Sequence, residues 1–186
     1  LSRFEATRIL VEGAIGNYRF DLASQAIHDF TRNEYCDWYI EFAKPALLSD
    51  DVQRALATRW TLVQVLERLA RLAHPLMPFI TEAIWLRVAP LAGAEGESIL
   101  TCAYPAADES LIDEEAEREM AWVQGFILGV RQIRGEMDLP PKQKIEVLLR
   151  HASPLDVTRS KAYDDFTRRL AGVETIRLLG ADEEAP

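Results

Sequence analysis

The stretch LASQAIHDFTRNEYCDWYIEFA, residues 22–43, decides the fold of this chain. It is long enough for about six helical turns and contains neither glycine nor proline. Asp21 stands where a helix N-cap is expected, and Lys44 precedes Pro45, a position that disfavours helical geometry. The sequence therefore predicts one long helix over 22–43.

Four further segments have the composition and punctuation of helices. The first closes with Gly16 and Asn17, both suited to a left-handed C-terminal cap. The second follows the candidate caps Ser49 and Asp50, and the others end before prolines. The expected ranges are 1–15, 50–74, 79–88 and 113–137, with an apolar stripe of Leu62, Leu66, Leu69 and Ala73 in the second.

The last fifty residues change character. Residues 145–149 and 175–179 are short, apolar and partly β-branched, and they flank a helix-like stretch over 154–170. We therefore expect a mainly α protein, an antiparallel helical bundle followed by a small α/β subdomain with two or three short strands. The expected divisions are a bundle core at 1–92, a connecting segment at 93–112 with a candidate strand at 98–104, a further bundle helix at 113–141 and a strand-helix-strand subdomain at 142–186.

The charge of the chain is unevenly distributed. Acidic residues number 30 against 21 Lys and Arg, a net charge of −9 that on its own argues against a nucleic-acid partner. Nine acids and one base fall between Glu95 and Glu119, so the remainder is close to neutral. If the remainder binds RNA, this acidic window should face away from it. Binding would then depend on stacking and base-edge contacts, with a shallow salt dependence.

Composition also argues against several classes of protein. Cys36 and Cys102 are the only cysteines, and the three histidines are scattered, so we expect no zinc site and no disulfide framework. The two thiols are expected to be reduced core residues of a cytoplasmic protein. No apolar run reaches the roughly 18 to 20 residues that span a bilayer. The chain begins at Leu1 in helix-like sequence, so we expect a segment of a longer polypeptide.

Catalytic motifs are missing from the sequence. It has no phosphate-binding loop, no nucleophile elbow, no dinucleotide fingerprint and no His-Glu-x-x-His. The acids from Asp113 to Glu119 are read as the solvated first turn of a helix, where carboxylates favour the helix dipole. No catalytic and no metal-binding residue is expected in this segment.

Aromatic residues gather in one place. Seven of the sixteen lie between Tyr18 and Phe42. On an α-helical wheel the apolar positions from Tyr35 to Ala43 sweep roughly 200°, about twice the stripe of a surface helix. Trp38 sits at one edge of this arc, among acidic residues. It is either a core residue of a helix packed on two sides or a stacking face for an unpaired RNA base.

Arg131 and Arg134 form a basic pair, three residues apart on one helix face. They are either solvated and bonded to neighbouring acids or in contact with phosphates. The sequence leaves both readings open.

Four stretches that span nearly the whole chain match a known family. They are NYRFD at 17–21, NEYCDWYIE at 33–41 followed by Lys44-Pro45, LAHPLMPFITEAIW at 72–85, and VRQIRGEM at 130–137 followed by Pro140. Together they resemble the anticodon-binding region of the class Ia aminoacyl-tRNA synthetases. Cys-Asp-Trp-Tyr-x-Glu within the second stretch resembles the valyl branch of that class.

The resemblance implies a tRNA anticodon-recognition module of a valine-tRNA ligase. Such a module would position valine tRNA for ATP-dependent aminoacylation by a catalytic domain that this chain lacks. The signatures His-Ile-Gly-His and Lys-Met-Ser-Lys-Ser are absent, so we do not expect the segment itself to activate valine. ATP and magnesium are implied for the parent enzyme only. The implied partners are the anticodon arm of valine tRNA and the catalytic domain, editing domain and C-terminal coiled coil of the parent chain, in a monomer with no membrane contact.

The resemblance also implies the site. A tryptophan at the end of the comparable helix of the methionyl relative stacks on the anticodon, which makes Trp38 the leading candidate. Its neighbours within one or two turns join it, and the basic pair supplies candidate backbone contacts. The candidate tRNA-binding residues are Trp38, Asp37, Asn33, Arg32, Arg131 and Arg134.

The stretch 72–85 is expected to be architectural. Phe79 and Trp85 would fill core, Glu82 would bond a neighbouring helix end, and His74 would bond the last carbonyls of its helix. Two alternatives to RNA recognition by a valyl module remain open. One is a structural or interdomain docking module with little RNA contact, and the other is the same region of the isoleucyl relative.

Overall fold

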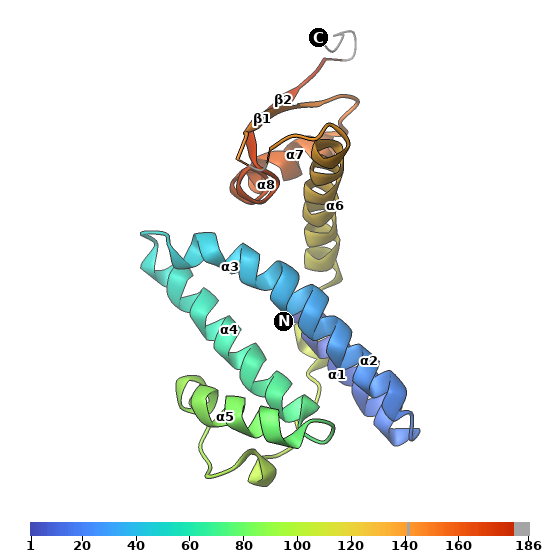
Figure 1. Cartoon of the computed structure of the whole chain (residues 1–186), viewed down its shortest axis with the longest axis vertical. Coiled ribbons are helices and arrows are strands. Elements are labelled where there is room, and N and C mark those ends of the chain that lie inside the picture. Colours follow the sequence, from blue (N-terminus) through green and yellow to red (C-terminus); the bar gives the residue numbers. More distant parts are fainter. Residues whose placement is uncertain (141, 181–186) are drawn as a thin grey trace. The chain divides into compact units, whose positions relative to one another are not determined.

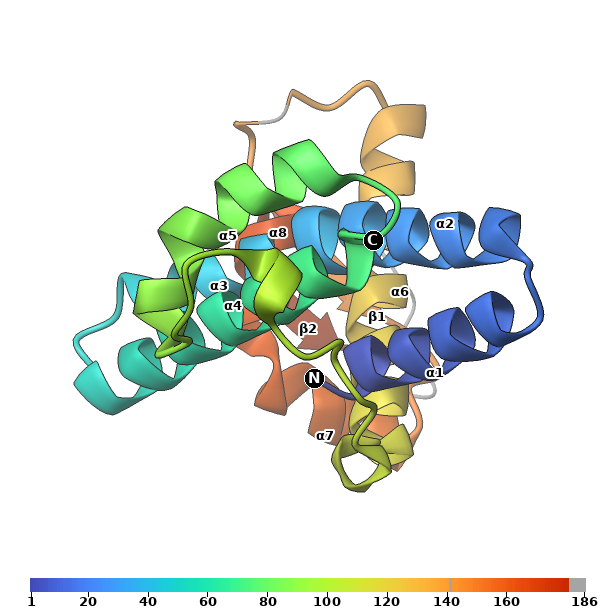
Figure 2. The ribbon, with the colours of Figure 1, turned by 90° about the horizontal axis from the view of Figure 1, so that it is seen from below.

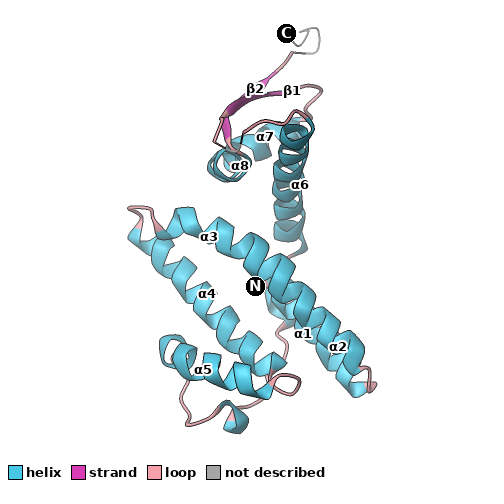
Figure 3. Cartoon of the chain, in the orientation of Figure 1, coloured by secondary structure: helices cyan, strands magenta, loops and turns pink. Residues whose placement is uncertain are grey.

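The computed structural model describes residues 1–140 and 142–180, which form two compact units divided between Asp113 and Glu114 (Figure 1). Helices dominate both units, and the two strands lie in the second (Figure 3). The mainly α fold with a small α/β part is confirmed. No helix in the described ranges has the length and apolarity to cross a membrane.

The first unit is built from helices around a main apolar core, with a smaller buried cluster around Trp85 of α5. Its elements are α1 (Ser2–Gly16), α2 (Phe20–Asp29), η1 (Phe30–Tyr39), α3 (Ile40–Leu47), α4 (Val52–Ala73) and α5 (Pro78–Ala92). Figure 2 shows α1 beside α2, and α4 packs against both α3 and α5. The buried residues of this core include Phe4, Val11, Ile27, Phe30, Tyr35, Val65, Leu69 and Leu72.

The long helix predicted over 22–43 exists, but its ends and its interior differ from the prediction. It runs without a break through α2, η1 and α3, and η1 is a π-helix. Asp21 does not cap it, because the helix already begins at Phe20, and the Asp21 carboxylate instead pairs with Arg19 at 2.7 Å. Pro45 lies inside α3, where it removes one backbone hydrogen bond. The helix continues past Pro45 because Ala46 extends the buried stripe of Phe42 and Ala43.

Other helix boundaries also differ from the predicted ones. Asp51, rather than Ser49 or Asp50, caps α4 by accepting a hydrogen bond from the backbone N–H of Arg54 at 3.0 Å. Pro90 does not end α5, which closes at Gly93 with a φ of 70°. The left-handed residue after α1 is Tyr18, with a φ of 58°, and not Gly16 or Asn17.

The strand predicted at 98–104 does not form. Ile99–Thr101 is instead the single 3-10 turn η2, followed by a second such turn, η3 (Glu109–Leu111). Glu82 explains the difference, because its Oε2 accepts hydrogen bonds from the Ser98 hydroxyl at 3.1 Å and the Ile99 N–H at 3.2 Å. The second of these bonds occupies a backbone N–H that a strand would need for pairing.

The connecting segment is tied to the bundle over much of its length. Tyr104 donates to the carbonyl of Leu72 at 3.0 Å, and Arg71 donates to the carbonyl of Ala103 at 2.9 Å. The Asp108 N–H donates to the buried carboxylate of Glu5, 103 positions away in the sequence, at 2.9 Å. The segment thus belongs to the first unit, although it has little regular structure.

The second unit is α6 followed by a β-α-α-β arrangement. Its elements are α6 (Glu114–Glu136), β1 (Ile145–Leu149), α7 (Pro154–Ala162), α8 (Asp164–Ala171) and β2 (Val173–Leu178). The strands are parallel, with Val147 opposite Ile176. The stretch predicted as one helix over 154–170 divides at Tyr163 into two.

The helix expected over 113–137 forms as α6, and it groups with the second unit. It packs against α8 of that unit. Arg159 of α7 donates to Glu119 of α6 at 2.9 Å, and Trp122 donates to Asp156 at 2.8 Å. These cross-links join α6 to the strands and helices that follow it.

Candidate nucleic-acid interface

The π-helix η1 is the element that positions four of the candidate residues. Hydrogen bonds from residue i to i+5 replace the i to i+4 bonds of an α-helix over Phe30–Tyr39. Phe30 and Tyr35 are each 7% exposed and lie in the same core cluster. An α-helix would point residues five apart about 140° away from each other. Burying both aromatics on one side therefore favours the wider turn.

The outward side of η1 carries the candidate residues. Arg32, Asn33 and Asp37 are exposed, and Trp38 is half-buried. Within the described parts of the chain, the side chains of the first three make no hydrogen bond or ion pair. The four form two pairs with the five-residue spacing of this helix, Arg32 with Asp37 and Asn33 with Trp38. The structure thus brings them together on one element, with polar groups available to a partner.

Trp38 is neither a fully buried core residue nor a fully exposed one. Its ring stacks on Phe42, with centroids 5.5 Å apart and planes inclined by 19°. Phe42 is buried on α3, so it holds the indole at the edge of the core. This arrangement keeps the indole in a defined position while part of it remains accessible.

Tyr35 anchors η1 to the bundle, a role that its place in the aromatic cluster did not indicate. Its hydroxyl donates to the carbonyl of Leu62 on α4 at 2.9 Å, and burial raises its pKa to about 12. Phe30 is held from the other side by Phe4 of α1, with ring centroids 5.2 Å apart. The five-residue spacing of Phe30, Tyr35 and Ile40 is the sequence signal for this register.

Cys36 is exposed on η1, so the prediction that both cysteines are core residues is wrong for this one. Cys102 is partly buried beside Trp85 and Ile99. Neither thiol is paired in a disulfide. The described residues contain no group of three or more His, Cys, Asp or Glu side chains that could hold a metal ion.

The other two candidate residues lie on α6, in the second unit. Arg131 is exposed and donates through Nε and Nη2 to the carbonyl of Leu170 at 3.1 and 2.9 Å. Arg134 is 8% exposed and donates to the carbonyls of Pro140 at 2.7 Å and Gly172 at 3.3 Å. Both guanidinium groups therefore tie α6 to the chain that follows it. Only Arg131 retains the exposure that a phosphate contact would need.

The stretch 72–85 has the expected architectural contacts, with two exceptions. Trp85 is 1% exposed and donates to Glu67 at 2.7 Å. His74 contacts Thr81 through Nδ1 at 2.7 Å instead of bonding helix carbonyls. Phe79 is 90% exposed, so the prediction that it fills core is wrong. It lies in the first turn of α5, on the side away from Trp85 and Thr81, which face the bundle.

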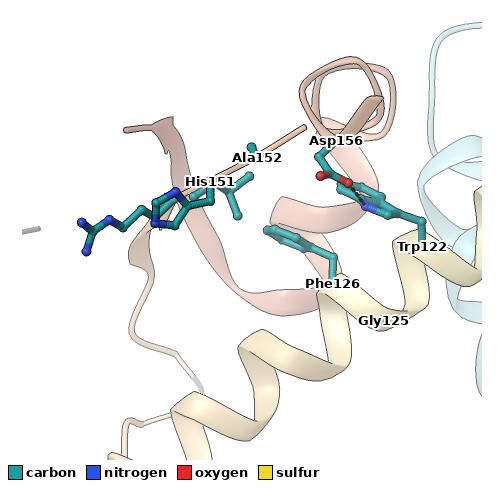
Figure 4. Close-up of a pocket in the computed structure, with 8 residues that line it drawn as sticks. Trp122, Gly125, Phe126, His151, Ala152 and Asp156 are labelled. Carbon is teal, nitrogen blue, oxygen red and sulfur yellow. Dashed lines mark hydrogen bonds between the residues drawn. The ribbon is translucent and has the colours of Figure 1, made fainter. Parts of the chain in front are cut away.

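A shallow pocket of about 370 Å³ lies in the second unit (Figure 4). Trp122 and Phe126 line it with rings 5.7 Å apart, and His151 stands opposite with a φ of 58°. Hydrogen bonds from Ser153 and from Trp122 lower the pKa of Asp156. The indole N–H of Trp122 is thus already hydrogen-bonded within the protein. None of the candidate residues lines this pocket.

Comparison with known proteins agrees with this architecture. Residues 1–149 match the family described as the anticodon-binding domain of tRNA ligase. The whole chain is also 43% identical to a valine--tRNA ligase of Acinetobacter baylyi, of which it spans 19%. It therefore corresponds to about a fifth of that relative. On these grounds the chain belongs to the family of anticodon-binding domains of tRNA ligases.

Proposed function

We propose that this chain is the tRNA anticodon-recognition module of a valine-tRNA ligase. It would position valine tRNA for ATP-dependent aminoacylation by a catalytic domain elsewhere in the same polypeptide. The family match over 149 residues and the 43% identity to a valine--tRNA ligase support this proposal. Because this similar protein is a valine--tRNA ligase, we favour the valyl assignment over the isoleucyl alternative.

The outward side of η1 is the observation that carries the proposal. It combines a half-buried indole with an amide, a carboxylate and a guanidinium that have no partner in the described residues. Proteins recognise unpaired RNA bases by stacking an aromatic ring on the base and by hydrogen bonding its edges. Trp38 supplies the ring, and Asn33, Asp37 and Arg32 supply the donors and acceptors. Arg131 is an additional candidate for a phosphate contact, and buried Arg134 has no place in this surface.

The other partners follow from the same proposal. The catalytic domain, the editing domain and a C-terminal coiled coil of the parent chain would complete the ligase. ATP and magnesium would bind outside this segment, which needs no cofactor of its own. We expect a monomeric ligase in the cytoplasm, in keeping with two cysteines that are not joined.

One surface favours a second role, docking against protein. Along the outer side of α5, four large apolar side chains are exposed. The charged residues between them in the sequence are Glu82, which bonds Ser98 and Ile99, and the exposed Arg87. Extended apolar surface of this kind marks protein contacts more often than RNA contacts. The exposed fractions are 90% for Phe79, 55% for Ile80, 50% for Leu86 and 74% for Leu91. Docking through α5 is compatible with RNA recognition through η1, since the two use different elements.

The test is a comparison of tRNAs in the full-length ligase that carries this chain. Valine tRNA with its native anticodon should be charged much more efficiently than the same tRNA with changed anticodon bases. An Asn33→Ala variant should narrow that difference while valine-dependent ATP–pyrophosphate exchange stays unchanged. If the enzyme charges both tRNAs equally well, the module does not read the anticodon, and docking becomes its main role.

A further inference from the structure

We propose that the π-helical register of η1, held by Tyr35, sets anticodon specificity by aligning Arg32 with Asp37 and Asn33 with Trp38 on one face. Tyr35 is then a positioning residue, which acts through the side chains that the helix presents. This inference rests on the proposed function. It adds the claim that the hydrogen-bonding pattern of the helix, and not only its residues, determines which bases are accepted.

The angular argument compares two geometries for the same residues. In an α-helix each residue turns by about 100°, so residues 32, 33, 37 and 38 would be spread over about 240° of the circumference. No single RNA loop could contact all four from one side. In a helix with i to i+5 bonds, residues five apart lie roughly one turn apart and close to one another. The π register therefore converts two scattered pairs into two neighbouring ones.

The core of the bundle enforces this register from the inside. Phe30 and Tyr35 are five apart, and both are buried in the same cluster, against which Ile40 also packs. In an α-helix one of the two aromatics would leave the core. Since inward and outward residues share one backbone, the geometry that buries Phe30 and Tyr35 also aligns the outward pairs.

Besides the exposed ion pair between Arg3 and Glu34 at 3.3 Å, two contacts of buried residues hold the π segment in place. The ring of Phe4 meets Phe30 at its start, and the hydroxyl of Tyr35 donates to the carbonyl of Leu62 at its middle. Tyr35, which makes the second contact, is only 7% exposed. Rotation of η1 toward an α-helical register would break this hydrogen bond, so Tyr35 resists that rotation.

The test removes one residue from the π segment of the full-length ligase. Deletion of Thr31 shortens the spacing between Phe30 and Tyr35 to four, which an α-helix satisfies with only about 40° between them. The core contacts can then persist, while Asn33 and Trp38 remain five apart and diverge. Thr31→Ala is the matched control, because it removes the bond from the Thr31 hydroxyl to the carbonyl of Ile27 without changing the register.

The measured quantity is the ratio of charging efficiency, kcat/KM, between native and changed anticodons. The deletion should lower this ratio by about tenfold or more, the scale of one lost base-stacking contact. Thr31→Ala should leave the ratio within about twofold. Valine-dependent ATP–pyrophosphate exchange should be unchanged in both. Far-ultraviolet circular dichroism and thermal melts establish that each variant is folded.

A folded deletion variant that keeps the full ratio would overturn the inference. If the deletion variant does not fold, Tyr35→Phe takes its place, since it removes only the hydroxyl and keeps the ring in the core. A lowered ratio for Tyr35→Phe supports the inference, and an unchanged ratio overturns it. Trp38→Ala separates the two proposals. If it lowers the ratio while the register variants do not, only the inference fails, and if none of them lowers it, the proposed function fails.

Discussion

Truncation of Trp38 to alanine should weaken charging of valine tRNA much more than it destabilises the bundle. The indole is half-buried and stacks on Phe42 at 5.5 Å. Such an aromatic pair contributes about 0.5–1.5 kcal/mol, so we expect the variant to lose about 1–2 kcal/mol of unfolding free energy. A fully buried tryptophan would cost about 3–5 kcal/mol.

The expected weakening of RNA binding should reduce charging of valine tRNA more than the loss of stability does. Stacking of a base on an aromatic side chain contributes about 1–3 kcal/mol, which corresponds to about a 5- to 150-fold loss in affinity. In the full-length ligase this should appear mainly as an increase in KM for tRNA. Trp38→Phe keeps an aromatic face and should lose only a small part of this effect. The rate of ATP–pyrophosphate exchange should be the same in all of these proteins.

Trp60→Ala is the matched control. Trp60 lies on α4 of the same unit, is 55% exposed and stands outside η1, so its truncation should leave the KM for tRNA unchanged. The reasoning is refuted if Trp38→Ala and Trp60→Ala have equal effects on charging. It is also refuted if Trp38→Ala abolishes the cooperative thermal transition, because Trp38 would then be a core residue.

Three further predictions concern pH, backbone geometry and salt. Burial raises the pKa of Tyr35 from 10.0 to about 12, so its contribution to stability is complete below pH 10 and is lost as the pH rises toward 12. The stability of Tyr35→Phe, followed by circular dichroism, should therefore fall less steeply with pH between 10 and 12 than that of the unchanged protein. Identical pH dependence in the two proteins would contradict this. Gly172 has a φ of 68°, and an added Cβ would lie 3.4 Å from Arg134, so Gly172→Ala should cost about 1–2 kcal/mol in urea unfolding of the second unit. Gly125→Ala, where space is open, is the control and should show no loss. Binding of valine tRNA through η1, with Arg32 as its exposed cation, should show a logarithmic salt slope near −1, and a slope several times steeper would mean that phosphate contacts dominate.

The sequence was sufficient for the class of the fold and for most of its elements. Helical periodicity located α1, α4 and α6, and β-branched runs located both strands. It failed where tertiary contacts outweigh local preference. Pro45 and Pro90 lie inside helices whose neighbouring turns are held by buried side chains. The segment 98–104 has the composition of a strand, but the carboxylate of Glu82, 16 residues away, holds it as a turn.

The candidate site was predictable in its location but not in its geometry. The aromatic cluster and the resemblance both indicated the helix that carries Trp38 and Asn33. The wide apolar arc measured on an α-helical wheel was the sign of a different helix, because a π-helix changes the angle between successive residues. Arg134 had the residue type for a phosphate contact, but it is buried and donates to the carbonyl of Gly172, 38 positions away. Such long-range partners cannot be read from local patterns.

Photo-crosslinking tests most directly whether the outward face of η1 contacts the anticodon. Valine tRNA carrying 4-thiouridine in the anticodon would be bound to the full-length ligase, irradiated, and the crosslinked peptide identified by mass spectrometry. We predict that the crosslink falls within the peptide that contains Asn33 and Trp38, and that excess valine tRNA with a native anticodon suppresses it. A crosslink confined to α5 or to the second unit would contradict the account.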